Sequence, residues 1–165
     1  MSNHNYQLTL KWSGNLGTGT SHYRAYERNH VISFAGKPDL LASADPTFRG
    51  DPTKHNPEEL LLAALSGCHM MSFLHVCVNA GVVVTAYEDH ATGSMVVNSD
   101  GSGRFTEVIL HPIVTVSEAS MTKNLEELHS RANKLCFIAN SCNFPIRHQA
   151  VGQYVSTDTP KNDSF

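Results

Sequence analysis

Two cysteines, Cys68 and Cys136, are the residues of this sequence whose type and surroundings best suit redox chemistry. Cys68 falls about ten residues into one predicted helix, and Cys136 falls on the apolar face of a second. A thiol becomes reactive when nearby positive charge or a helix N-terminus favours its thiolate. An isolated helix cysteine is otherwise an inert, buried, small hydrophobic residue, so both interpretations stay open for this pair.

The charge that could activate Cys68 depends on the course of its helix. If the helix is unbroken, Cys68 lies ~16 Å from the first helical residue, beyond the field of the helix end, and needs a cation from elsewhere. Arg49 lies in the loop just before this helix, and Glu58 could orient its guanidinium. If Gly67 breaks the helix instead, Cys68 starts a new one, and the helix end itself contributes. The sequence leaves both alternatives open.

The remaining cysteines and the ten histidines do not form a metal-binding pattern. There is no CxxC, no HExxH and no tight Cys/His cluster, so a metal site is not expected. Cys77 lies nine residues after Cys68, on roughly the opposite helix face, which favours packing. His69 is interpreted as a core or interface histidine. Trp12, Phe48, Met70, Met71 and Phe73 could line an apolar pocket, although core packing also accounts for most of them.

The elements that must position these residues follow from local signals. Asn56-Pro57-Glu58-Glu59 is a strong helix start, and Gly81 ends a helix that continues to about Asn79. A second helix is predicted over 124–139, with one apolar face. Strands are predicted over 6–12, within 21–34, over 82–87, in a hairpin of 95–98 and 104–116, and over 146–155. The order strands, long helix, strands, helix, strand indicates an α+β fold with antiparallel sheets.

Length and composition limit the possible classes of protein. The chain has 165 residues, which suits one domain, expected over 1–155 with a polar tail over 156–165. A net charge of −3 without a basic run argues against nucleic acid as the main partner. The uncharged stretch between Glu59 and Glu88 is long enough to span a membrane, but its polar residues favour a buried helix. The N-terminus lacks the features of a secretory signal, so a reducing cytoplasm is expected.

The same residues carry a resemblance to a known family. The core match is Asn56-Pro57-Glu58-Glu59-Leu60, followed by Ala63, Ala64 and Cys68; a second is Cys136-Phe-Ile-Ala-Asn-Ser; a third is Trp12-Ser-Gly with Gly17-Thr-Gly-Thr. These segments resemble the OsmC/Ohr family, the osmotically inducible and organic-hydroperoxide-resistance proteins. The resemblance covers about Tyr6 to Val155. It implies antiparallel sheets around a long, central, buried helix in an intertwined homodimer, with each active site built from both chains.

The resemblance further implies a thiol peroxidase for organic hydroperoxides. Cys68 would become a sulfenic acid and then form a disulfide with Cys136. A dithiol such as dihydrolipoamide would restore the thiols, and no cofactor or metal is implied. The family's glutamate maps onto Glu58. Its arginine maps onto Arg49 with a one-residue shift in the loop.

Two departures from the family pattern keep alternatives open. The second cysteine is commonly followed by proline, whereas Phe137 follows Cys136. Cys142 is an additional thiol that could resolve the sulfenic acid if the second helix ends near Asn140. Arg24 and Arg28 compete with Arg49 for the activating role. A non-catalytic OsmC-like dimer, serving binding or structure, is therefore the alternative function.

Overall fold

The computed structural model describes residues 3–155, and the predicted tail over 156–165 lies outside them. Contacts divide the chain into two compact units, one ending at Leu61 and the other starting at Leu62. The two units are described separately below. The single domain predicted over 1–155 stays a prediction.

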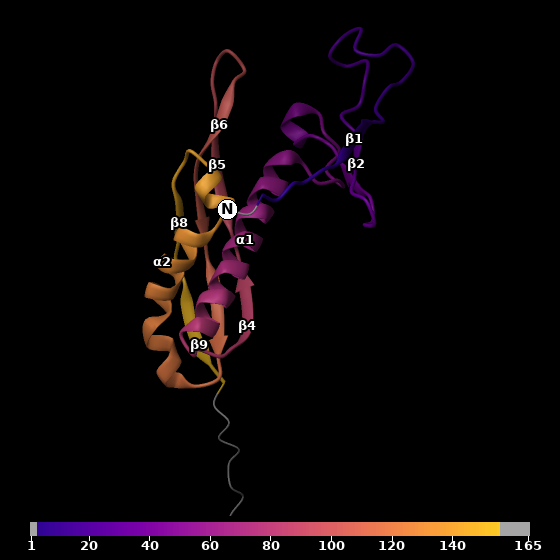
Figure 1. The fold of residues 1–165 in the computed structure, drawn as a ribbon. Helices are drawn as coiled ribbons and strands as arrows, with labels where there is room; N and C mark the ends of the chain where they lie inside the picture. Colours follow the sequence, from indigo (N-terminus) through magenta and orange to yellow (C-terminus); the bar gives the residue numbers. More distant parts are fainter. Residues whose placement is uncertain (1–2, 156–165) are drawn as a thin grey trace, which may run out of the picture. The chain divides into compact units, whose positions relative to one another are not determined.

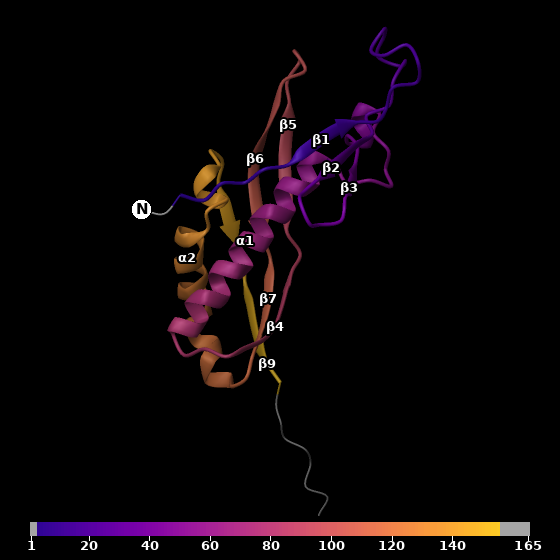
Figure 2. The same ribbon diagram turned by 45° about the vertical axis from the view of Figure 1, so that its right-hand side comes forward.

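The first unit contains a small antiparallel sheet in the order β1-β2-β3. Its strands are β1 (Thr9–Trp12), β2 (His30–Ser33) and β3 (Leu40–Ala42), with Trp12 opposite His30. The segment predicted as one or two strands over 21–34 therefore supplies only β2 (Figure 2). Residues before β2 form a loop held by Arg28, whose guanidinium lies 4.3 Å from the ring centroids of both Tyr23 and Tyr26. The same loop also pairs with the chain after β1 through an isolated antiparallel bridge between Asn15 and Tyr26.

The long helix α1 (Pro57–Asn79) has the predicted bounds. Its start is fixed by a capping box in which the Asn56 side-chain oxygen accepts the Glu59 N–H at 2.8 Å, while the Glu59 carboxylate accepts the Asn56 N–H at 3.2 Å. Gly81 follows the end of the helix with φ of 69°, the left-handed conformation that glycine adopts most easily. The helix is continuous through Gly67, which excludes the alternative of a new helix starting at Cys68.

The second unit combines α1 from Leu62 onward with two three-stranded sheets, β4-β7-β9 and β5-β6-β8. The pairs β4/β7 and β5/β6 are antiparallel as predicted, whereas β6/β8 and β7/β9 are parallel. Parallel pairing needs a long crossover, which α2 supplies between β7 and β8. The elements are β4 (Val84–Asp89), β5 (Thr92–Val97), β6 (Gly103–Leu110), β7 (Pro112–Val116), α2 (Leu125–Leu135), β8 (Ile146–His148) and β9 (Val151–Tyr154).

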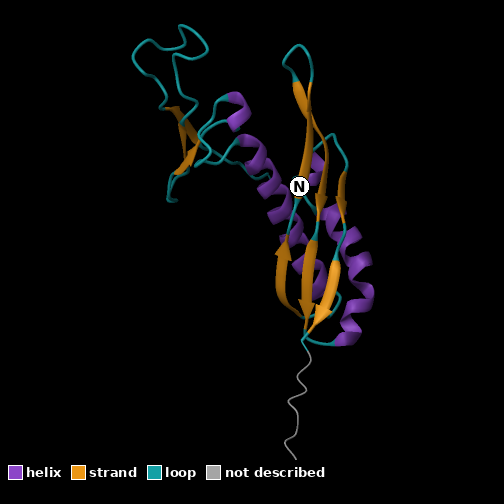
Figure 3. Ribbon diagram, turned by 180° about the vertical axis from the view of Figure 1, so that it is seen from behind, coloured by secondary structure: helices purple, strands orange, loops and turns teal. Residues whose placement is uncertain are grey.

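The core of the second unit lies where α1, α2 and β7 meet. Figures 1 and 3 show both helices on the same face of the β4-β7-β9 sheet. The buried cluster contains Phe73, Val76, Cys77, Val114, Val116, Leu125, Leu128 and Ala132. Burying these side chains removes most of their apolar surface from water, worth about 1.5–3 kcal/mol for each large one. This packing fixes α1 against α2.

The burial predicted for α1 holds on one face only. Leu65, His69, Phe73 and Val76 follow one another at helical spacing and are buried, whereas Met71 and Val78 are 65% and 76% exposed. By length and composition alone α1 could cross a membrane, and it is the one such helix among residues 3–155. One of its faces packs against β7 and α2 in the core cluster.

The second helix is shorter than the 124–139 predicted. It ends at Leu135, and Cys136 is its C-cap residue in an extended conformation (φ −72°, ψ 108°). Leu135, expected on the buried face, is 49% exposed, while Cys136 is fully buried. A short 3₁₀ turn over Ala139–Ser141 follows. Cys136 is thus placed by the end of a helix and not by its apolar face.

Candidate active site

The two cysteines predicted for redox chemistry lie together in the second unit. Cys68 is in the middle of α1, Cys136 caps α2, and their thiols are close enough to hydrogen-bond. Both are free thiols. Cys68 is partly exposed, whereas Cys136 is completely buried. One residue of the pair is therefore partly open to solvent and the other is enclosed.

The surroundings of Cys136 hold it in the protonated form. Burial and the neighbouring Cys68 thiol together raise the pKa of Cys136 to about 11. The Ala139 N–H lies 3.5 Å from this sulfur in the 3₁₀ turn, and backbone hydrogen bonds from Ala139 and Ile138 partly offset the rise in its pKa. A protonated, buried thiol is a poor nucleophile toward a dissolved peroxide.

The other two cysteines differ from this pair. Burial raises the pKa of Cys77 to about 11, and its side chain belongs to the hydrophobic core, as its position opposite Cys68 predicted. Cys142 is partly exposed at the end of the 3₁₀ turn, and burial alone raises its pKa. The pKa of Cys136, in contrast, also responds to Cys68. Of the two candidate resolving thiols, Cys136 is the one whose pKa responds to Cys68 within residues 3–155.

The predicted activating residues belong to the first unit. Arg49 adopts a left-handed conformation (φ 66°) after the short 3₁₀ helix Pro46–Phe48. Within the described residues it forms no ion pair with Glu58. Oε2 of Glu58 is buried without a hydrogen-bond partner in the same part of the chain.

The three competing arginines line one cavity of the first unit. Arg24, Arg28 and Arg49 all border this cavity of about 370 Å³. Arg28 is already engaged, because it donates to the backbone oxygens of Tyr26 and Tyr23 at 2.6 and 2.8 Å. No ion pair of Arg24 or Arg49 is present within residues 3–155. Two guanidinium groups thus remain available for an anion.

A buried group of histidines lies beside the thiol pair. His69, which follows Cys68 on α1, is buried as predicted, and its Nε2 lies 3.0 Å from Nδ1 of His129 on α2. His148 on β8 stacks on the His69 ring and lies tilted against the His129 ring, with centroids 5.7 and 5.5 Å away. His129 and His148 were not predicted from the sequence. His129 lies four residues after Leu125, on the buried face of α2. That helical spacing could have predicted its burial from the sequence.

The two sequence neighbours of Cys136 help to line an apolar cavity. Met71, Ser72, His75, Leu135 and Phe137 line a cavity of about 340 Å³ in the second unit. Of the residues predicted for an apolar pocket, Met71 is here and Phe73 is in the core. Phe137, which replaces the usual proline, is 79% exposed. Within residues 3–155, no three His, Cys, Asp or Glu side chains are arranged to hold a metal ion.

Comparison with known proteins identifies the family of this chain. A sequence profile described as OsmC-like protein matches residues 50–150. The chain belongs to the OsmC-like family. A solved OsmC-like protein of unknown function from Vibrio cholerae is 32% identical, with a TM-score of 0.79, and the alignment covers 90% of this chain and 100% of that one. The membership of the OsmC/Ohr family and the α+β fold class predicted from the sequence are confirmed.

More distant solved members share the fold. An organic hydroperoxide resistance protein OsmC from Legionella pneumophila is 17% identical (TM-score 0.66), covering 92% of this OsmC-like chain and 99% of that one. An organic hydroperoxide resistance protein from Elizabethkingia anophelis, solved with thiocyanate bound, is 16% identical (TM-score 0.64), with 93% and 100% covered. The comparison with curated proteins gives no match.

Proposed function

We propose that this OsmC-like protein is a thiol-dependent peroxidase that reduces organic hydroperoxides through Cys68 and Cys136. The observation that carries the proposal is the contact between a partly exposed thiol and a buried one. A peroxide can reach Cys68 from solvent, and the sulfur that would resolve the product is already adjacent. The names of the Legionella and Elizabethkingia relatives support the same class of substrate.

The reaction follows in two steps at these sulfurs. The Cys68 thiolate attacks the terminal oxygen of the hydroperoxide, the O–O bond breaks, and the alkoxide takes a proton and leaves as an alcohol. Cys68 is then a sulfenic acid. The Cys136 sulfur displaces its hydroxyl group, which leaves as water with the Cys136 proton, and a disulfide forms. Because the pKa of Cys136 is about 11, this proton transfer to the leaving hydroxyl group is essential near pH 7.

Activation of Cys68 needs a cation, since α1 is unbroken and the thiol is far from the helix N-terminus. We assign this role to Arg49, with Glu58 as the carboxylate that orients it, as the family resemblance implies. The unpaired Arg49 guanidinium and the unpartnered Glu58 oxygen support this assignment. Arg24 is the alternative, because Arg28 is held by two backbone oxygens. Loss of peroxide turnover in Arg49→Ala but not in Arg24→Ala would decide between them.

The proposal includes a homodimer, a lipoyl-type dithiol as reductant and a reducing cytoplasm as the setting. The four free thiols fit a reducing compartment. The exposed apolar side chains of α1, among them Met71 and Val78, fit a surface that a second copy covers. Sedimentation of the reduced protein tests the dimer, and turnover with dihydrolipoamide against glutathione tests the reductant.

A second candidate function is a non-catalytic OsmC-like dimer that binds a small molecule. The observation that favours it is the cavity bordered by Met71 and Phe137, at the point where this chain departs from the family pattern. In that case Cys68 would react with alkylating agents as slowly as an ordinary thiol. A fast, peroxide-specific oxidation of Cys68 would exclude it.

A disulfide map after limited oxidation tests the proposal. Reduced protein receives one equivalent of cumene hydroperoxide or hydrogen peroxide, free thiols are alkylated, and peptides are analysed by mass. We expect a Cys68–Cys136 disulfide that forms faster with cumene hydroperoxide. Cys142→Ser is the matched control and should form the same bond, whereas Cys68→Ser should form none. A Cys68–Cys142 bond would change the resolving residue, and four free thiols would refute the peroxidase.

A further inference from the structure

The cavity that the three arginines border in the first unit carries an excess of positive charge. All residues that line it belong to that unit. Two carboxylates, those of Glu27 and Asp51, border it as well. The Asp51 carboxylate is already neutralised, because it accepts hydrogen bonds from Lys54 Nζ at 2.6 Å and from Thr53. Positive charge therefore exceeds negative charge around the cavity, which favours an anion as its ligand.

Arg28 supplies a positive charge whose position is fixed. Its guanidinium donates to the backbone oxygens of Tyr26 and Tyr23 at 2.6 and 2.8 Å, and it lies 4.3 Å from the centroid of each ring. These contacts keep the charge in place, but they occupy part of its hydrogen-bonding fork. Arg28 therefore attracts an anion, while direct contacts with it fall to Arg24 and Arg49.

The side chains of Arg24 and Arg49 have donors to spare. Within residues 3–155, neither guanidinium has an ion pair or a hydrogen bond. Each carries five N–H donors in a planar fork that matches the oxygens of a carboxylate or a phosphate. Ser43, fully buried beside the cavity, accepts the Asp51 N–H at 3.0 Å, and its own hydroxyl hydrogen has no acceptor in the same residues. The cavity thus offers several unused donors to an oxyanion.

The loop that carries Arg49 holds it in an unusual backbone conformation. Arg49 has a φ of 66°, and it is the one non-glycine residue with a positive φ among residues 3–155. Its N–H and that of Gly50 donate to the backbone oxygens of Pro46 and Asp45, at 2.9 and 3.0 Å. Residues in this conformation cost free energy, and they cluster at functional sites. The loop thus fixes the backbone from which Arg49 reaches the cavity.

We propose that this cavity is an oxyanion site, in which Arg24 and Arg49 bind the carboxylate or phosphate group of a small ligand and the charge of Arg28 supports them. Either group has enough oxygens to accept hydrogen bonds from both guanidinium groups. The site goes beyond the proposed peroxidase, because binding needs neither thiol. The two sources of the oxyanion, a carboxylic acid and a phosphate, are the two arms of the test.

Calorimetric titration of the full chain measures binding directly. Reduced protein at pH 7 receives inorganic phosphate in one arm and acetate in the other, with sodium chloride keeping the ionic strength constant. We expect saturable binding of at least one anion, with a Kd of about 1 mM or below. The NMR signal of the Trp12 indole N–H locates the site, because this single tryptophan donates to the backbone oxygen of Glu27 at 2.9 Å. Binding in one arm identifies the ligand class, and no saturable binding in either arm would overturn the proposal.

Variants assign the binding to the two arginines. Arg24→Gln and Arg49→Gln each remove charge-assisted hydrogen bonds, and each should raise the Kd at least about tenfold. Lys37→Gln is the matched control, because Lys37 carries the same charge in the same unit but lies over the Phe34 ring and does not border the cavity. Its Kd should equal that of the unmodified protein. Equal losses in all three variants would show a general effect of charge and overturn the proposal. If Arg49→Gln does not fold, Arg24→Gln against Lys37→Gln decides.

A kinetic test separates this site from the proposed function. Arg49 is also the cation assigned to Cys68, so a bound anion should compete with the Cys68 thiolate, and this consequence alone rests on the proposed function. At ten times its Kd the anion leaves about one tenth of the protein free, so oxidation of Cys68 by cumene hydroperoxide should slow about tenfold. Binding without slower oxidation would reject Arg49 as the activating residue and leave the oxyanion site standing. Cys68 that resists the peroxide even without an anion would refute the peroxidase, and the calorimetry would still decide the site.

Discussion

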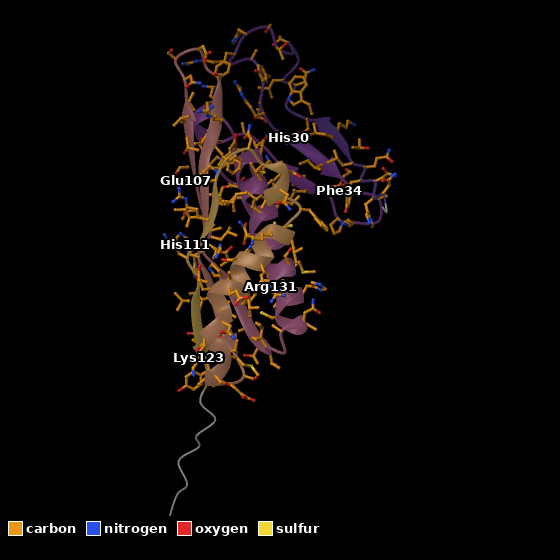
Figure 4. All side chains as sticks on the ribbon, turned by 60° about the vertical axis from the view of Figure 1, so that its left-hand side comes forward. His30, Phe34, Glu107, His111, Lys123 and Arg131 are labelled. Carbon is orange, nitrogen blue, oxygen red and sulfur yellow. The ribbon has the colours of Figure 1, made fainter. Side chains whose placement is uncertain are left out.

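Replacing Asp89 tests how the second unit holds α1 against its sheets near Cys68. One carboxylate oxygen accepts the hydroxyl of Ser66 on α1 at 2.5 Å, and the other accepts the backbone N–H of His111, labelled in Figure 4 between β6 and β7, at 2.7 Å. Hydrogen bonds to a charged group contribute about 1.5–3 kcal/mol each. Asp89→Ala removes both and should lower the free energy of unfolding by about 3 kcal/mol. For a chain of this size, that corresponds to a fall in Tm of about 6–12 °C.

Urea unfolding of the reduced protein at pH 7 measures this change, with Ser66→Ala and the double variant completing a double-mutant cycle. The coupling energy between Asp89 and Ser66 should be about 1–2 kcal/mol. Asp100→Ala is the matched control, because Asp100 accepts two hydrogen bonds from Ser102 in an exposed hairpin turn and should cost below about 1 kcal/mol. A loss below about 1 kcal/mol for Asp89→Ala, or a coupling energy near zero, would refute this reasoning.

Three further changes follow from the same structure. The folded pKa values of His69 and His129 lie below the unfolded value of about 6.5, so the unfolded chain binds more protons in acid. The free energy of unfolding should therefore fall from about pH 7 toward pH 4, by about 2 kcal/mol per ring at pH 5. Urea midpoints that do not change with pH would contradict this. Asn56→Ala removes the helix cap and should cost about 1 kcal/mol, measured by thermal unfolding, while Asn56→Asp should retain most of it. Gly50→Ala should distort its loop, because a Cβ there would overlap the backbone of Ala44; an unchanged Tm would refute the contact.

Local signals in the sequence were sufficient for the helix α1 and for the pair of thiols. The helix start at Asn56 and the end near Gly81 depend on residues next to them in sequence, and the structure has the predicted bounds. The family motif around Cys68 and Cys136 identified two residues that the fold brings together. These predictions required no knowledge of tertiary packing.

Features that depend on packing were not predictable in the same way. The end of α2 at Leu135 has no glycine or proline beside it, so the apolar pattern alone extended the helix too far. Parallel pairing of β8 and β9 depends on the path of the crossover and not on strand composition. His129, the hydrogen-bond partner of His69, lies 60 residues away in the sequence. The absence of an Arg49–Glu58 ion pair within residues 3–155 also depends on tertiary geometry.

The parallel addition of β8 and β9 has a consequence for synthesis of the chain. These two strands pair with β6 and β7, the middle strands of the two sheets, and they are the last elements described. Until residues 146–154 have left the ribosome, one edge of both middle strands has no partner. Exposed strand edges are the surfaces through which nascent chains associate with one another. The interval between synthesis of β7 and of β9, about 35 residues or several seconds, is therefore when this protein is most prone to aggregate.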